Sequence, residues 1–364
     1  MKKTLLTICL VWMCFSLSAQ KIIDLSGKWS FSIDRQDNGE KEKWFSHTLN
    51  DFINLPGSMP EKLKGDEVTA KTQWTGSLYD SSYYYNPYME KYRKEGNIKF
   101  PFFLTPDKHY VGAAWYQKEV NIPADWKGER ILLFLERPHI ETTVWVNGQK
   151  TGMQNSLCVP HQYDITRYVR PGKCTITIRV DNRIKEINVG PDSHSITDQT
   201  QGNWNGIVGR ICLQTTPKTY FDDIQIYPEP EQKLASVKVV IKGTGTAKVK
   251  LSAESFNTDK KHIVPAIQQE IKLNKGVTET EMVLPMGNDM LLWDEFHPAL
   301  YKLKAEVTNG KKTEIKEIQF GMRRFEIKGK WFYVNGRKTQ LRGTVENCDF
   351  PLTGYAPMDV ESWE

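Results

Sequence analysis

The sequence predicts a mainly β chain in which two β-sandwiches are followed by the first β/α unit of a truncated (β/α)8 barrel. Short segments with apolar–polar alternation recur at even spacing and are separated by Gly, Pro and Asn, which is typical of sandwiches and jelly rolls. A strand-like run near residue 340 is then followed by a polar cluster and a helix-like start. A chain of 364 residues is long enough for two or three domains.

The first 19 residues have the pattern of a secretory signal peptide, with cleavage after Ala19. Lys2 and Lys3 precede the apolar run Leu5–Leu17, and small residues end the segment. We therefore expect export to the periplasm or the medium. Lipid attachment at Cys14 is the alternative, although bulky residues precede it. No second apolar stretch approaches membrane-spanning length, so no membrane span is expected.

Charge and cysteine usage exclude several classes of protein. The net charge of +5 is spread along the chain without a basic block, which argues against nucleic-acid binding. Cys158, Cys174, Cys212 and Cys348 follow the signal segment and lack metal-site spacing. Two alternatives are compatible with the sequence: one disulfide among Cys158, Cys174 and Cys212, or buried free thiols. The sequence contains no phosphate loop and no HExxH motif, so neither a metal nor a cofactor is expected.

The first sandwich is expected over residues 20–217. Its predicted strands are Leu25–Ile33, Ala114–Ile122, Arg130–Glu136, Glu141–Val146, His161–Thr166 and Thr175–Asn182. The segment Gln73–Phe103 is rich in aromatic residues, but its apolar positions follow neither the helix period nor the strand period. We therefore expect an insertion packed by its own side chains. Its aromatic rings suit either sugar faces or plain packing. The polar stretch Gly190–Gly209 is either functional or loose, and Trp204 between two asparagines favours function.

The second sandwich is expected over residues 218–321 and has the size of an immunoglobulin-like domain. Its predicted strands are Asp223–Pro228, Ser236–Ile241, Ala247–Leu251 and Leu300–Val307. Residues 322–364 contain a hairpin turn at Asn335-Gly336 and a predicted strand at Thr339–Gly343. A polar loop follows, and Asp359–Glu364 is typical of the first turn of a helix.

The order of these parts resembles glycoside hydrolase family 2, which includes β-galactosidases, β-glucuronidases and β-mannosidases. The resemblance rests on six runs in the order of that family. They are Ala114–Tyr116, Thr143–Gly148, Tyr163–Thr166, Asn203–Ile207, Leu292–Tyr301 and, taken together, Phe320–Arg323 with Val334–Gly343. The resemblance implies a jelly-roll sugar-binding domain, an immunoglobulin-like sandwich and the start of a catalytic barrel.

The chemistry implied by the resemblance is retaining glycoside hydrolysis by two glutamates, one as acid/base and one as nucleophile. In the family both lie late in the barrel, and the acid/base follows an asparagine. The sequence has no Asn-Glu dipeptide. We therefore expect no catalytic residue here, place the catalytic pair downstream of Glu364, and predict that the chain alone is inactive.

Seven residues are candidates for contacts with a sugar: His109, Asp198, Asn203, Trp204, Glu346, Asn347 and Asp349. Trp204 is expected to stack on a sugar ring, while polar side chains in such loops also satisfy backbone groups. His109 falls where the family has an asparagine, and Asn347 where some members have histidine.

The expected ligand is the end of a β-linked oligosaccharide or polysaccharide, with a β-galactoside first and a β-glucuronide or β-mannoside behind it. The predicted function is the N-terminal part of a retaining exo-β-glycosidase. The alternatives are a stand-alone carbohydrate-binding sandwich protein and, more weakly, an adhesion protein. A separate chain that carries the rest of the barrel is a candidate partner.

Overall fold

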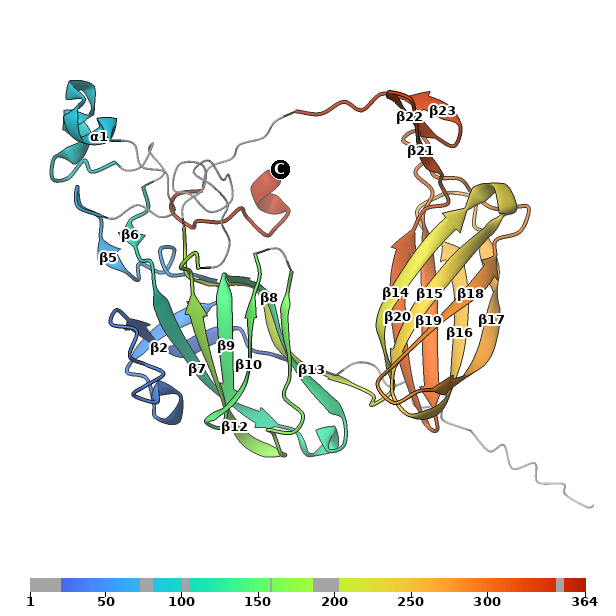
Figure 1. Ribbon diagram of the computed structural model, residues 1–364, viewed down its shortest axis with the longest axis horizontal. Coiled ribbons are helices and arrows are strands. Elements are labelled where there is room, and N and C mark those ends of the chain that lie inside the picture. Colours follow the sequence, from blue (N-terminus) through green and yellow to red (C-terminus); the bar gives the residue numbers. More distant parts are fainter. Residues whose placement is uncertain (1–20, 73–80, 100–104, 158, 186–202, 345–349) are drawn as a thin grey trace, which may run out of the picture. The chain divides into compact units, whose positions relative to one another are not determined.

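The computed structural model describes residues 21–72, 81–99, 105–157, 159–185, 203–344 and 350–364 (Figure 1). The predicted signal peptide lies outside these residues, as do Cys158 and Cys348. The chain forms two compact units. The first unit combines residues 21–216 with residues 342–364, and the second comprises residues 217–341. Each is described below by itself.

Two antiparallel sheets form the first unit. One has the order β1(Ile22–Asp24)-β13(Gly206–Thr216)-β8(Arg130–His139)-β11(His161–Asp164), with β4(Gly57–Ser58) also pairing with β13. The other has the order β10(Gln149–Asn155)-β9(Glu141–Val146)-β12(Gly172–Asp181)-β7(Ala113–Ile122)-β2(Gly27–Asp34)-β3(Asp51–Leu55). A separate two-stranded ladder pairs β5(Asp66–Glu67) with β6(Lys108–His109). All six strands predicted for this region are therefore present, with shifted ends.

Side chains from both sheets share one core, which includes Phe31, Leu133, Val144 and Ile178. Strand β9 is buried along its whole length and not only at alternate positions. The reason is a second, smaller cluster that includes Trp145, whose ring stacks on Phe45 at 5.1 Å. The segment around residue 45 thus buries side chains of the six-stranded sheet that do not belong to the main core.

Helical structure is confined to short pieces in the described residues. They are α1(Ser82–Tyr85) and the 3-10 helices η1(Trp44–Ser46), η2(Pro87–Arg93), η3(Ala124–Trp126), η4(Pro230–Gln232) and η5(Glu361–Trp363). None of the described helices has the length and apolar character needed to cross a membrane.

The second unit is also built from two antiparallel sheets around one core. Their orders are β14(Tyr220–Glu229)-β15(Leu234–Lys242)-β18(Val277–Pro285) and β17(Ile263–Leu273)-β16(Gly245–Ser255)-β19(Tyr301–Asn309)-β20(Lys312–Phe320). The four predicted strands correspond to β14, β15, β16 and β19. Strands β17, β18 and β20 were not predicted.

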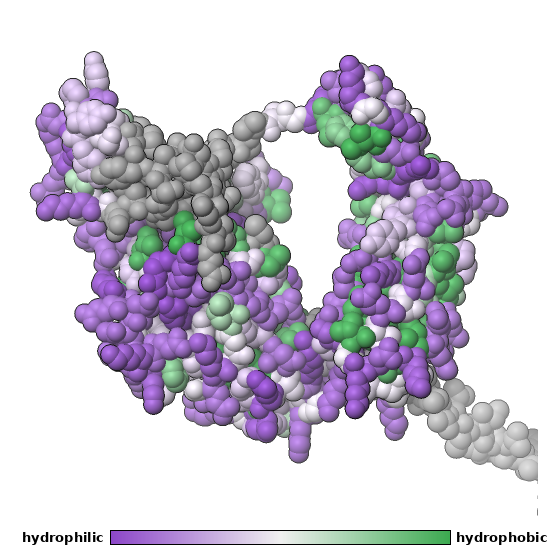
Figure 2. Space-filling model, in the orientation of Figure 1, coloured by the Kyte–Doolittle hydropathy of each residue, from purple (hydrophilic) through white to green (hydrophobic). Residues whose placement is uncertain are grey.

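Residues 325–339 form a small antiparallel sheet from β21(Phe325–Lys328), β22(Trp331–Val334) and β23(Arg337–Thr339). The predicted turn at Asn335-Gly336 is confirmed, with positive φ at both residues and Val334 paired with Arg337. Strand β23 pairs with β22 only as far as Thr339, opposite Phe332, so the predicted strand Thr339–Gly343 is wrong after its first residue. Figure 2 shows hydrophobic atoms gathered over this sheet, where Phe325 and Ile327 are exposed.

The mainly β class is confirmed, whereas a strand–loop–helix unit does not occur in the described part of residues 322–364. The expected first helical turn at residues 359–364 is the 3-10 helix η5. Cys174 and Cys212 are buried free thiols, so no disulfide joins them. Burial raises the pKa of the Cys174 thiol to about 11.

Candidate functional site

The candidate site lies in the first unit, where residues 203–205 lead into β13 beside β4 and residues 350–364, which we call the tail. The close approach of β13 to β4 depends on Gly206, because the two strands pair at this residue. A Cβ at Gly206, whose φ is +150°, would lie 2.4 Å from the carbonyl oxygen of Gly57. Only glycine permits so close an approach of two backbones.

Trp204 is the centre of this site and is only 2% exposed. Its ring stacks on His139, with centroids 4.5 Å apart and planes 20° apart. Its backbone carbonyl accepts a 2.8 Å hydrogen bond from Nδ1 of His139. Burial lowers the pKa of His139 to about 4, so this imidazole is neutral at physiological pH.

The tail covers Trp204. The Tyr355 ring lies 5.5 Å from it, and a Cβ on Gly354 would lie 2.6 Å from Trp204 Cδ1. The expectation that Trp204 stacks on a sugar ring therefore does not fit this arrangement, because His139, Tyr355 and Gly354 already pack against the indole. Its observed role is to join β8, the start of β13 and the tail.

The two flanking asparagines are buried and bind backbone. Nδ2 of Asn205 donates 3.0 Å hydrogen bonds to the carbonyls of Gly112 and Val180, and its Oδ1 accepts one of 2.8 Å from the Tyr116 hydroxyl. Nδ2 of Asn203 donates to the carbonyl of Asn182 at 3.0 Å. Asn205 therefore behaves as the backbone-satisfying alternative predicts.

Asn203 differs from Asn205 because its Oδ1 is buried and has no hydrogen-bond partner within the described residues. A buried acceptor without a donor is unfavourable by about 1–3 kcal/mol. A sugar hydroxyl is a donor of the kind that this atom accepts. Asn203 thus has an acceptor to spare for a ligand.

His109 lies in β6, where it pairs with Asp66 of β5. Burial lowers the pKa of its imidazole to about 4, so it too is neutral. Asn182 joins this segment to Asn203: its Nδ2 donates to the carbonyl of Tyr110, and its Oδ1 accepts from the amide of Gly112, both at 2.8 Å. The link to residue 203 thus runs through the backbone that follows His109.

Two hydrogen bonds fix the tail on the first unit. Ser58 Oγ donates to the carbonyl of Thr353 at 2.6 Å, and the Tyr355 hydroxyl donates to Glu61 Oε2 at 2.7 Å. Burial would raise the pKa of Glu61, but hydrogen bonds from Lys62 and Tyr355 outweigh it and lower the pKa. Burial and the Glu61 carboxylate raise the pKa of Tyr355. At neutral pH the pair is therefore a phenol donating to a carboxylate.

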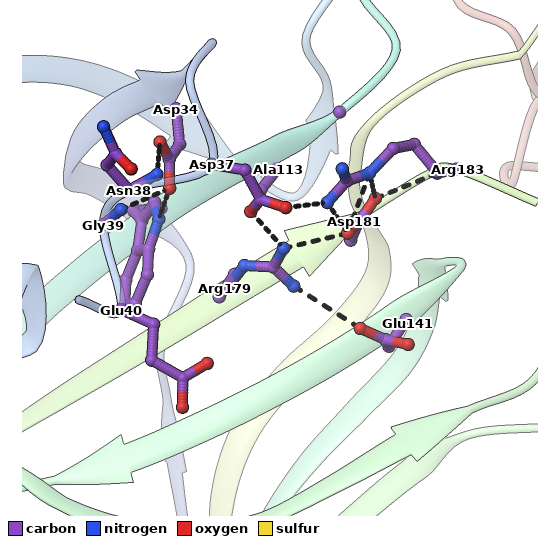
Figure 3. Close-up of polar contacts among 12 residues, drawn as sticks. Asp34, Asp37, Asn38, Gly39, Glu40, Ala113, Glu141, Arg179, Asp181 and Arg183 are labelled. Atoms are coloured by element: carbon purple, nitrogen blue, oxygen red, sulfur yellow. Dashed lines mark hydrogen bonds and ion pairs between the residues drawn. The ribbon is translucent and has the colours of Figure 1, made fainter. Parts of the chain in front are cut away.

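An ion cluster at the end of β12, buried except at Asp37, supports this region (Figure 3). Arg179 lies between Asp37, Asp181 and Glu141, with nitrogen–oxygen distances of 2.7, 2.9 and 3.4 Å. Asp181 is fully buried, which would raise its pKa, but Arg183 and Lys185 hydrogen-bond it and the pKa is lowered. Since Asn182 follows directly, the cluster holds the residue that anchors Asn203.

A cavity of about 810 Å³ lies between the tail and the sandwich, with Pro56, Val208 and Phe350 in its wall. Its volume is in the range of small-molecule sites. Its carboxylates are already bonded: Glu61 to Tyr355, Glu136 to Arg210 and Asp359 to Ser362. In the described parts of the chain, no group of three metal-ligating side chains comes together.

The structure adds several residues to the predicted set, namely Glu61, His139, Asn182, Asn205 and Tyr355. Asn205 belongs to the same run as Asn203 and could have been found from it. The others come from distant segments, and only the fold brings them together. Asp198, Glu346, Asn347 and Asp349 lie outside the described residues.

Comparisons with known families match the described chain as far as residue 323. The family described as glycosyl hydrolases family 2, sugar binding domain, matches residues 22–217. The family described as glycosyl hydrolases family 2 matches residues 219–323.

Individual relatives are similar over most of this chain. A β-glucuronidase of Paenibacillus borealis is 24% identical over 92% of the chain and 51% of its own length. A β-galactosidase large subunit of Latilactobacillus sakei is 23% identical over 93% of the chain and 52% of its own length. The chain thus spans about half the length of these relatives.

Among solved structures, a β-glucuronidase of Ruminococcus gnavus is similar in fold. It superposes with a TM-score of 0.61 at 19% identity, covering 90% of this chain and 49% of that one.

Proposed function

This chain belongs to glycosyl hydrolases family 2, and we propose that it is the N-terminal part of a retaining exo-β-glycosidase. The observation that carries the proposal is the match of two successive family domains, in order, over residues 22–217 and 219–323. In this proposal the first unit supplies one wall of a sugar site and residues beyond Glu364 supply the catalysis.

The hydrogen-bonding groups at the candidate site support a sugar-facing role. Asn203 has a buried acceptor to spare, and the tail holds residues 203–205 in one conformation through Trp204. Groups held rigidly bind polar ligands with a smaller loss of conformational entropy. We therefore propose Asn203 as the described residue that accepts a hydrogen bond from a substrate hydroxyl.

Catalysis is proposed to need residues outside this chain. A retaining mechanism needs two carboxyl groups about 5 Å apart, one protonated and one ionised. The carboxylates that line the described cavity are bonded to other side chains. Lowering of the Glu61 pKa also opposes a role as general acid, which requires a raised pKa.

The proposed substrates are β-galactosides first, with β-glucuronides and β-mannosides next. This order comes from the sequence resemblance, whereas similarity to β-galactosidases and β-glucuronidases supports the first two classes without ranking them. Hydrolysis of 4-nitrophenyl β-galactoside, β-glucuronide and β-mannoside by the purified 364-residue chain should be no faster than in buffer. Turnover at the rate of a full-length relative would refute the assignment of catalysis to residues beyond Glu364.

Downstream sequence provides the complementary test. DNA that follows codon 364 is proposed to encode the catalytic barrel, with an Asn-Glu dipeptide. When that segment is added in the same chain or as a second chain, one of the three glycosides should be hydrolysed. In the combined protein, the Asn203→Ala variant should have a higher KM than the wild type. The control variant Asn50→Ala, changed at an exposed position, should keep the KM of the wild type. Absence of a barrel downstream would favour the stand-alone carbohydrate-binding protein.

A further inference from the structure

A small helical module in the first unit presents two largely exposed tyrosines. The module comprises residues 81–99 and contains α1 and η2. The Tyr85 and Tyr88 side chains are 74% and 84% exposed. Tyrosine is amphipathic, so each of these exposed rings offers a ligand both an apolar face and a hydroxyl.

The module is held together by its own contacts, which makes the tyrosine pair a fixed feature. Tyr83 is 5% exposed, and its hydroxyl donates to the carbonyl of Tyr92 at 2.9 Å. Arg93 donates to the carbonyl of Tyr83. These bonds connect the two helical turns from within.

The connection between the exposed rings is also constrained. Asn86 separates them, its amide bonding the carbonyl of Ser82 at 2.8 Å and its Oδ1 accepting from the Tyr88 amide at 3.0 Å. Pro87 follows and restricts φ at the first position of η2. Tyr85 and Tyr88 are thus attached to a backbone with little freedom, so a ligand that stacks on them orders few groups.

We propose that Tyr85 and Tyr88 form a stacking platform for an acidic polysaccharide chain, separate from the candidate site around Trp204. Three observations favour this ligand. The rings have hydroxyls for hydrogen bonds with sugars. The module has four basic and two acidic side chains, a net charge of +2 that complements carboxylates on a glycan. It also lies within residues 22–217, which match a sugar-binding domain.

The platform goes beyond the proposed glycosidase function because it binds polymer without acting on it. Retention of a polysaccharide at a second place raises the local concentration of chain ends near the enzyme. Its test reads binding alone, so the result does not depend on hydrolysis.

Affinity for a hexamer of galacturonic acid, measured by isothermal titration calorimetry on the 364-residue chain, tests the proposal. Tyr85→Ala and Tyr88→Ala should each weaken binding about tenfold, as expected for removal of one aromatic contact. The Phe variants, which keep the rings, should stay within about threefold of the wild type. Tyr227→Ala, at an exposed tyrosine of β14, should have no effect. Thermal unfolding should be unchanged in all five variants because the side chains are exposed.

Several outcomes would overturn the platform. One is no binding of the acidic hexamer by the wild-type chain, and another is equal affinity in the Ala variants. Tighter binding of a neutral β-1,4-linked galactose hexamer would overturn the acidic ligand. Tyrosine-dependent self-association in light scattering, without glycan binding, would show that the rings bind protein instead.

Discussion

Gly354→Ala is the substitution that tests most directly whether the tail holds Trp204. The added Cβ would lie 2.6, 2.7 and 2.8 Å from three side-chain atoms of Trp204. The indole cannot move away freely because His139 stacks on it. Overpacking of this kind costs about 1–3 kcal/mol, and the φ of +81° adds about 1–2 kcal/mol for any residue with a Cβ.

The free-energy cost of Gly354→Ala is comparable with the free energy contributed by the two hydrogen bonds that fix the tail. The neutral bond from Ser58 contributes about 0.5–1.5 kcal/mol, and the bond from Tyr355 to a carboxylate about 1.5–3 kcal/mol. A loss of about 2 kcal/mol or more shifts the equilibrium between docked and undocked tail by about thirtyfold or more. The tail of the variant should therefore leave the sandwich much more often.

Chymotrypsin cleavage after Tyr355 measures this equilibrium, because the residue is partly buried in the docked tail. Release of the peptide Ala356–Glu364, followed by mass spectrometry, should be about thirtyfold faster or more in Gly354→Ala. The matched control is Gly343→Ala, where an added Cβ meets no atom within 4 Å and φ is not positive. Equal release rates in the two variants would refute the docking of the tail on Trp204.

Three further predictions follow from buried groups. Asp181→Asn should lower the free energy of unfolding by about 3–5 kcal/mol at pH 7. Because the pKa of Asp181 is depressed in the folded state, its carboxylate contributes fully to stability above the unfolded pKa of 3.8. The difference in free energy of unfolding between variant and wild type, measured with urea, should therefore narrow as the pH falls below 3.8. Asp125→Asn, at a solvent-exposed residue, should show no comparable gap because water screens its ion pair with Lys21. His139→Leu leaves a buried carbonyl without its donor and should lower the free energy of unfolding by about 1–3 kcal/mol; an unchanged urea midpoint would contradict this. Cys174 and Cys212 should react with Ellman's reagent only after unfolding, and a disulfide found by mass spectrometry would contradict their free state.

The strands that sequence reasoning found have β-branched and aromatic residues in regular order, as in β7 and β19. Strands β17 and β18 were among those it missed, because polar and apolar residues come in runs there: Gln268–Glu270 in β17 is a polar run, and Met282–Leu284 in β18 is an apolar one. The hairpin at Asn335-Gly336 was predictable because the turn residues fix its geometry. The end of β23 was not, because it depends on pairing with β22.

The candidate site was predictable only in its local part. The run Asn203-Trp204-Asn205 stands out in the sequence, but whether its ring faces a ligand depends on His139 and Tyr355, which lie 65 and 151 residues away. Burial of Trp204 is thus a property of long-range packing. The spare acceptor of Asn203 is likewise visible only once its neighbours are placed.

The return of the chain to its first unit after residue 341 sets a schedule for biosynthesis. Gly354 is made 150 residues after Trp204. At about 5–20 residues per second, a ribosome needs roughly 8–30 s to cover that interval. Throughout this delay the indole of Trp204 lacks the cover that the tail provides. A chaperone that binds the nascent sandwich at this ring is therefore expected to dissociate when the tail emerges.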